Sequence, residues 1–214
     1  MHVVDLGAEI RDGQVSHFPV TLREHSSYRE NAVYTRPPAN GFSTRLIQMC
    51  DHTATHVDAP VHFFPNAASI DSLPVSAFCG SAVCLDLFPP RDAQRAAAVA
   101  HFEEALSRAG LTVDAGDIVL LRLGAGGYAG ISAALADALA LRRISSLGVD
   151  APTPDCPDDP TMPVHLRLLG AGITLVEGLR NLELVAGKRF LYVGAPLKLV
   201  GATGSPLRPL AILD

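Results

Sequence analysis

One segment of twelve residues constrains the fold more than any other part of the chain, because it holds three of the eight histidines and two carboxylates. The segment runs from Asp51 to His62 and reads DHTATHVDAPVH. Four of its potential metal ligands have even numbers: His52, His56, Asp58 and His62. On a helix Asp58 and His62 would point well away from His52 and His56, whereas on extended backbone all four side chains leave the same side. The pattern therefore predicts extended backbone.

A straight strand would not bring these side chains together. His52 and His56 would lie about 13 Å apart, too far to share one ion whose ligand bonds are about 2.1 Å. The segment must therefore curl, and we expect bends at 53–55 and 59–60. Imidazole with carboxylate suits Zn²⁺, Mn²⁺ or Fe²⁺ better than Ca²⁺ or Mg²⁺, and three protein ligands leave a coordination position for water. The spacing thus predicts a catalytic metal site.

Length and composition predict one globular domain. The 214 residues are enough to bury a core, so we expect a single domain over 1–214. Hydrophobic residues make up 48% and charged residues 18%, a balance that often accompanies an oligomer with part of its surface buried. The net charge of −5 and the absence of a basic cluster argue against nucleic acid or an anionic membrane as a partner.

Targeting signals and cysteine usage favour a cytoplasmic protein. No apolar run approaches the ~18 residues of a membrane span. The first six residues, MHVVDL, lack the basic and apolar regions of a secretory signal peptide. The four cysteines show neither C-x-x-C spacing nor the density of a disulfide scaffold, so we predict reduced thiols. Of these, Cys50 alone is near the histidines, and we interpret it as a small buried hydrophobic residue.

Strands and helices alternate along the chain, which predicts an α/β domain. Several late strands follow one another without helices, so we expect a mixed sheet. The first forty residues predict mostly irregular structure. Predicted strands cover 3–6, 43–50, 81–88, 117–123, 146–149, 173–176, 190–193 and 207–213; predicted helices cover 92–109, with Asp92 as N-cap, 131–144 and 163–171.

Two other enzyme classes find no support in the sequence. The glycine-rich loop at 124–127 follows a strand, but it matches neither the P-loop nor the dinucleotide-binding pattern, so we expect no nucleotide site. A serine hydrolase is disfavoured because the chain lacks a G-x-S-x-G motif.

The segment from His52 to His62 resembles the H-x-G-T-H-x-D-x-P-x-H signature of the metal-dependent cyclase-like hydrolases, with Ala54 in place of glycine. That family includes bacterial kynurenine formamidases and isatin hydrolases. The resemblance covers about 43–214, whereas the N-terminal third matches poorly and leaves the substrate open. Further similar motifs follow in order: 148–152 with Asp155, the pair His165 and Glu177, 195–199, and 204–208.

The resemblance implies a swivelling β/β/α domain that forms a homodimer or a larger assembly such as a tetramer. It also implies one or two divalent ions per chain, Zn²⁺ or Mn²⁺, with Asp58 able to bridge two of them. His62 would be the catalytic acid/base. The implied metal ligands are His52, His56, Asp58, His165 and Glu177.

The predicted function is hydrolysis of a small molecule, an aryl formamide like N-formylkynurenine, to an amine and formate. A metal-bound hydroxide would attack the carbonyl, and His62 would shuttle the proton. One alternative is the opening of a cyclic amide or lactone by the same chemistry, and another is a metal-binding module without catalysis. The aromatic residues nearest the motifs, which could stack an aryl ring, are Phe63, Phe64, Phe78 and Tyr128.

Three residues within the segment leave specific questions. Thr55 is interpreted either as a hydrogen-bond partner of a ligand or as an ordinary turn residue. Ala54 is harmless if its φ is negative and unfavourable if its φ is positive. Asp51 receives no role.

Overall fold

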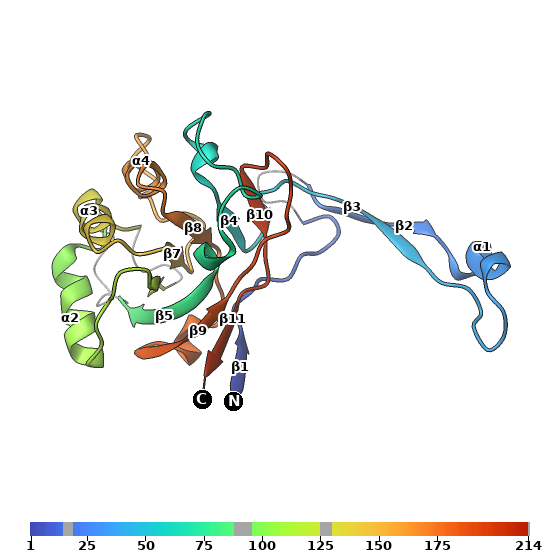
Figure 1. Ribbon diagram of the computed structural model, residues 1–214, viewed down its shortest axis with the longest axis horizontal. Helices are drawn as coiled ribbons and strands as arrows, with labels where there is room; N and C mark the ends of the chain where they lie inside the picture. Colours follow the sequence, from blue (N-terminus) through green and yellow to red (C-terminus); the bar gives the residue numbers. More distant parts are fainter. Residues whose placement is uncertain (15–18, 88–95, 125–129, 214) are drawn as a thin grey trace.

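The structure is a computed structural model that describes residues 1–14, 19–87, 96–124 and 130–213. A nine-stranded sheet dominates it, with the strand order β1-β11-β9-β5-β6-β7-β8-β4-β10 (Figure 1). These strands are β1 (His2–Asp5), β4 (His56–Asp58), β5 (Cys79–Asp86), β6 (Ile118–Arg122), β7 (Ser146–Val149), β8 (Thr174–Glu177), β9 (Lys188–Val193), β10 (Gly204–Pro206) and β11 (Leu210–Leu213).

The sheet is mixed, which confirms the prediction from the late strands. At its centre β5, β6, β7 and β8 pair in parallel. On one side β9, β11 and β1 continue the sheet in antiparallel fashion, and on the other side β4 and β10 do so. The predicted α/β class is therefore confirmed as well.

Three helices cover one face of the sheet: α2 (Val99–Ala109), α3 (Ala133–Leu141) and α4 (Pro163–Gly170) (Figure 1). The sequence of β6 explains why both faces are covered. Val119 and Leu121 belong to the core beneath the helices, whereas Ile118 and Leu120 belong to a second core on the opposite face. A strand buried on both faces requires such a continuous apolar run.

The second core shows that the sheet curls. Val4 of β1 and Val57 of β4 belong to the same buried cluster, although six strands lie between them in the sheet order. Ala211 of β11 and Val176 of β8 join the same cluster. The two ends of the sheet therefore wrap around one core, against which the strand β4 packs.

A separate ribbon projects from this body (Figure 1). β2 (Thr21–Ser26) pairs with β3 (Thr44–Gln48), and α1 (Tyr28–Asn31) and a 3-10 helix (Ala32–Tyr34) follow β2 at the far end. We call residues 21–48 the arm. The strand expected at 43–50 is confirmed, but it pairs within the arm and not in the main sheet. The expectation of mostly irregular structure missed β2, whose sequence TLREHS has no apolar face.

Other predicted elements agree with the structure except at their ends. The helix expected at 131–144 is α3, which begins after Ser132, whose side chain accepts a hydrogen bond from the Leu135 amide. The helix expected at 92–109 is described from Val99 onward, and the proposed N-cap Asp92 lies outside the described residues. The strand expected at 207–213 begins only at Leu210. Further 3-10 helices span Pro60–His62, Val75–Ala77 and Leu182–Leu184. Within the described ranges, no helix is long and apolar enough to cross a membrane.

Candidate metal centre

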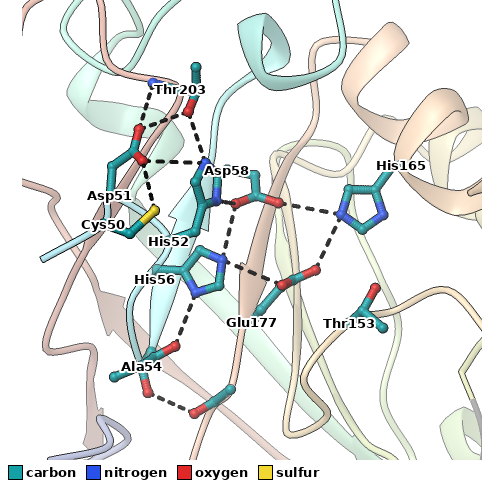
Figure 2. Close-up of polar contacts among 12 residues, drawn as sticks. Cys50, Asp51, His52, Ala54, His56, Asp58, Thr153, His165, Glu177 and Thr203 are labelled. Carbon is teal, nitrogen blue, oxygen red and sulfur yellow. Dashed lines mark hydrogen bonds and ion pairs between the residues drawn. The ribbon is translucent and has the colours of Figure 1, made fainter. Parts of the chain in front are cut away.

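Strand β4, which lies next to the edge strand β10, places two of the predicted ligands on one face. His56 and Asp58 are two residues apart on a strand, so their side chains leave the same side. β8 is the antiparallel neighbour of β4, and Glu177 lies directly opposite His56. His56 Nε2 is 3.3 Å from Asp58 Oδ1 and 3.4 Å from Glu177 Oε2. One patch at the sheet edge therefore holds an imidazole and two carboxylates (Figure 2).

A turn before β4 brings His52 to the same patch. Ala54 has φ +57°, in the left-handed region, and the backbone bends there. As a result His52 Nδ1 lies 2.7 Å from Asp58 Oδ1, and the ring centroids of His52 and His56 are 5.1 Å apart. The expected bend at 53–55 is thus present. Because a non-glycine residue costs about 1–2 kcal/mol in this conformation, Ala54 stands where glycine would be favoured.

His165 reaches the patch from the first turn of α4. Its Nε2 is 3.4 Å from Asp58 Oδ2 and 3.3 Å from Glu177 Oε1. Asp155 fixes this helix start by accepting hydrogen bonds from the Val164 amide at 2.7 Å and the His165 amide at 3.1 Å. The buried Asp155 carboxylate also lies 2.6 Å from His165 Nδ1. The sequence pointed to Asp155 only as part of a motif, and its capping of a helix eight residues later was missed.

These separations have the dimensions of a metal site. Two ligands about 2.1 Å from a tetrahedral ion lie roughly 3.4 Å apart, which matches the four contacts of His56 and His165 with the carboxylates. Asp58 Oδ1 and Glu177 Oε1 are buried and have no hydrogen-bond partner among the described residues. Buried charged oxygens are normally paired, so a bound cation explains both.

Two groups of three residues could each hold an ion, and Asp58 belongs to both. One consists of His52, His56 and Asp58, and the other of Asp58, His165 and Glu177. Asp58 Oδ1 faces the first pair of imidazoles, whereas Oδ2 faces His165. The structure therefore brings together all five residues that the resemblance implied as ligands.

The outward nitrogen of each imidazole is tied to a partner. His56 Nδ1 donates to the Ala54 carbonyl at 3.0 Å, and His165 Nδ1 donates to Asp155. His52 Nε2 lies 2.9 Å from the hydroxyl of Thr203. Each ring thus presents its other nitrogen to the carboxylates, and such outer bonds orient histidine ligands in metal sites.

The carboxylates dominate the electrostatics of the patch. Burial lowers the pKa of His165, but hydrogen bonds to the surrounding carboxylates, with Asp155 contributing most, outweigh burial and raise that pKa to about 11. Burial also raises the pKa of Glu177, with a smaller contribution from the charge of Asp58. Because His165 and Glu177 hold protons this strongly, the cluster is suited to bind a divalent cation in place of those protons.

His62 lies beside the two groups and outside both. The 3-10 helix at Pro60–His62 directs the ring of His62 toward the patch. The centroid of this ring is 4.1 Å from that of His52 and 6.3 Å from that of His165. Much of the residue is exposed, and the remainder lies against the cluster. Partial burial and the charges of the two neighbouring histidines lower the pKa of His62, although Asp58 opposes them. His62 is therefore neutral at neutral pH and able to accept a proton.

The structure gives specific partners to two nearby residues, Asp51 and Thr55. Asp51, which received no role, accepts hydrogen bonds from Thr203 and Gly204. Thr55 bonds no ligand: its hydroxyl donates to the Gly178 carbonyl at 2.7 Å and accepts from the Ala8 amide at 2.8 Å, so it joins three segments of backbone.

Of the aromatic candidates, Phe63 contacts the cluster directly, stacked on His165 with ring centroids 4.8 Å apart. Phe64 packs at the edge of the core beneath the helices. Phe78 is unsuitable for stacking a substrate because it is buried in the second core. Tyr128 lies outside the described residues.

A curled mixed sheet with three imidazoles and two carboxylates at its edge defines an α/β protein with a candidate metal centre. The model of the putative cyclase family matches residues 4–156, and the chain therefore belongs to that family. This confirms the resemblance inferred from the sequence motifs.

Individual relatives agree with this placement. The chain is 30% identical over 162 residues to a kynurenine formamidase of Salinibacter ruber, with 76% of each chain covered. It superposes on isatin hydrolase A from Labrenzia aggregata with a TM-score of 0.82 and 25% identity, covering 98% of this chain and 93% of the other. It is also similar to a potential metal-dependent hydrolase with cyclase activity, with a TM-score of 0.74 and 25% identity, covering 98% and 96%.

Proposed function

We propose that the protein is a metal-dependent hydrolase that splits an aryl formamide into an amine and formate. The observation that carries this proposal is the arrangement of three imidazoles around two carboxylates, with the exposed His62 beside them. The relatives named kynurenine formamidase support the formamide as substrate class. A metal-binding module without catalysis would have no need of His62 at this position.

The proposed cofactor is a divalent ion, Zn²⁺ or Mn²⁺, at one or both groups. His52, His56 and Asp58 would hold the first ion. Asp58, through its second oxygen, would join His165 and Glu177 around the other. The mixed imidazole and carboxylate donors suit either metal, and the two buried oxygens without a partner support the assignment.

A divalent ion in such a site supplies a Lewis acid and lowers the pKa of bound water. The residues of the chain would handle the proton. His62, neutral at neutral pH, takes a proton from the attacking water as the new carbon–oxygen bond forms. It then gives the proton to the nitrogen as the carbon–nitrogen bond breaks. Formate and the free amine are the products, and His62 returns to its starting state.

Opening of a cyclic amide is the second candidate, because the chain superposes on isatin hydrolase A over nearly its whole length. Both reactions add water to an amide carbonyl and break its carbon–nitrogen bond, and they differ in whether the amine departs as a separate product or stays attached to the acid. The test offers N-formylkynurenine and isatin separately to the purified protein with Zn²⁺ or Mn²⁺. We expect release of the amine from the first. Clear opening of isatin without turnover of the formamide would overturn the formamidase assignment in favour of the second candidate.

We also propose that the protein is a cytoplasmic homo-oligomer. The arm supports assembly, because an isolated two-stranded ribbon is marginally stable in water and this one exposes Val33, Tyr34 and Ile47. Four unpaired thiols are typical of the cytoplasm.

Light scattering after gel filtration should give the mass of a dimer or tetramer, and Ile47→Glu should shift the measured mass toward that of the monomer. Leu141→Glu, at an exposed site on α3, is the matched control and should leave the mass unchanged.

A further inference from the structure

Asp51 lies in the turn before β4 and binds a segment from the opposite end of the chain (Figure 2). Its Oδ2 accepts three hydrogen bonds: from the Thr203 hydroxyl at 2.7 Å, the Thr203 amide at 3.2 Å and the Gly204 amide at 3.3 Å. Asp51 thereby joins the turn that carries His52 to the start of β10.

The hydrogen bonds of Thr203 fix the tautomer of His52. A hydroxyl has one hydrogen to donate, and Thr203 donates it to the carboxylate of Asp51. The oxygen of the same hydroxyl lies 2.9 Å from His52 Nε2 and must accept there. His52 therefore carries its hydrogen on Nε2. Its Nδ1 is then the nitrogen that faces Asp58, 2.7 Å from Oδ1.

The backbone of β10 sets the position of the same ring. A Cβ at Gly204 would lie 2.7 Å from His52 Cε1 and 2.9 Å from the Val57 carbonyl oxygen. The ring of His52 therefore lies directly on this glycine. Thr203 thus contacts one nitrogen of the ring, and Gly204 lies against the ring. The carboxylate of Asp51 accepts hydrogen bonds from both residues.

We propose that Asp51 and Thr203 are positioning residues for the metal centre, acting through His52. The proposal rests on the metal site proposed above and adds a residue pair to it. The outward nitrogens of His56 and His165 bond directly to a carbonyl and a carboxylate. His52, in contrast, is held by the hydroxyl of Thr203, which lies 151 residues further along the chain, and the carboxylate of Asp51 orients that hydroxyl. Without that hydroxyl, the tautomer and the ring orientation of His52 are no longer fixed, although every proposed metal ligand is still present.

The test is Thr203→Val, which keeps the branched shape and removes the hydroxyl. We expect Zn²⁺ affinity, measured by competition with a chromophoric chelator, to fall by about 10- to 100-fold. Thr203→Ser, which retains the hydroxyl, should restore most of the affinity, and Asp51→Asn should weaken binding in the same direction. Long-range ¹H–¹⁵N NMR of the metal-free protein should show His52 protonated on Nε2 in the wild type and a mixture of tautomers in Thr203→Val.

Thr174→Val provides the control, because the same change there removes a buried hydroxyl that has no hydrogen-bond partner among the described residues. It should bind Zn²⁺ as the wild type does, and circular dichroism should show every variant folded. Wild-type Zn²⁺ affinity in Thr203→Val, or equal losses of affinity in Thr203→Val and Thr174→Val, would overturn the positioning role of Asp51 and Thr203. Neither result would contradict the metal site itself. If the wild-type protein takes up no Zn²⁺, both the proposed metal site and the positioning role are wrong.

Discussion

His56 and Glu177 stand directly opposite each other across the β4–β8 pair, with His56 Nε2 3.4 Å from Glu177 Oε2. More than a hundred residues of sequence separate them. Directly paired residues on neighbouring strands share one face of the sheet, so strand register alone brings the two side chains together. The second group of potential ligands therefore depends on β8 keeping its alignment with β4.

Replacement of Glu177 should remove one ion and leave the other. Glu177→Gln keeps the size of the side chain and removes its charge, and the group formed by His52, His56 and Asp58 stays intact. We expect the metal content at saturation to fall from two ions per chain to one, with the lost ion bound at least about 100-fold more weakly. Elemental analysis after dialysis against Zn²⁺ measures this. An unchanged metal content would exclude Glu177 as a ligand.

Replacement of His62 should separate catalysis from metal binding. His62→Ala removes the proposed proton carrier, so kcat on the formamide should fall by about 10²- to 10⁴-fold. Zn²⁺ content should stay at the wild-type value because His62 lies outside both groups of potential ligands. His2→Ala, at an exposed position on β1, serves as the control and should be fully active. Wild-type turnover by His62→Ala would refute the acid/base role.

Restoration of the signature glycine should stabilise the protein. Ala54 has φ +57°, which costs about 1–2 kcal/mol, and the greater freedom of an unfolded glycine returns about 0.4–1 kcal/mol of that. Ala54→Gly should therefore raise the free energy of unfolding by about 1 kcal/mol, measured in urea. The same change at Ala134, on the exposed face of α3, should lower it by about 1 kcal/mol. A loss of stability in Ala54→Gly would contradict the strain assigned to this turn.

Metal binding should release a proton at neutral pH. In the metal-free protein the pKa of His165 is raised to about 11, so the ring is protonated at neutral pH and must lose its proton to bind an ion. Zn²⁺ affinity should consequently rise with pH, by up to about tenfold per unit below that pKa. Titration calorimetry in buffers with different heats of ionisation counts the proton. Affinity independent of pH would show that His165 takes no part.

Some of the fold follows directly from the sequence. The apolar run of β6 predicted a strand covered on both faces, and the even spacing of His52, His56 and Asp58 predicted a curled segment with these side chains on one side. Both predictions rest on local geometry, because side-chain direction alternates along extended backbone.

Other features depend on pairings that no local pattern specifies. β2 has no buried residue and no apolar alternation, so only its partner β3 makes it a strand. The contact between Asp51 and Thr203 arises because β10 pairs with β4, a register set by the curl of the whole sheet. Asp155 and His165 meet because a helix begins eight residues after the carboxylate, and hydrophobic periodicity does not reveal such a cap.

The two layers of carboxylates around the imidazoles have a consequence for electroneutrality. Asp58 and Glu177 lie among the rings, and Asp51 and Asp155 stand behind His52 and His165. Together the four carboxylates carry four negative charges when ionised, which equals the charge of two divalent ions. A single ion at the group of His52, His56 and Asp58 would balance two of these charges, and the proton on His165, whose pKa is raised to about 11, would balance a third. A second ion beside Glu177 would therefore exchange that proton for metal charge.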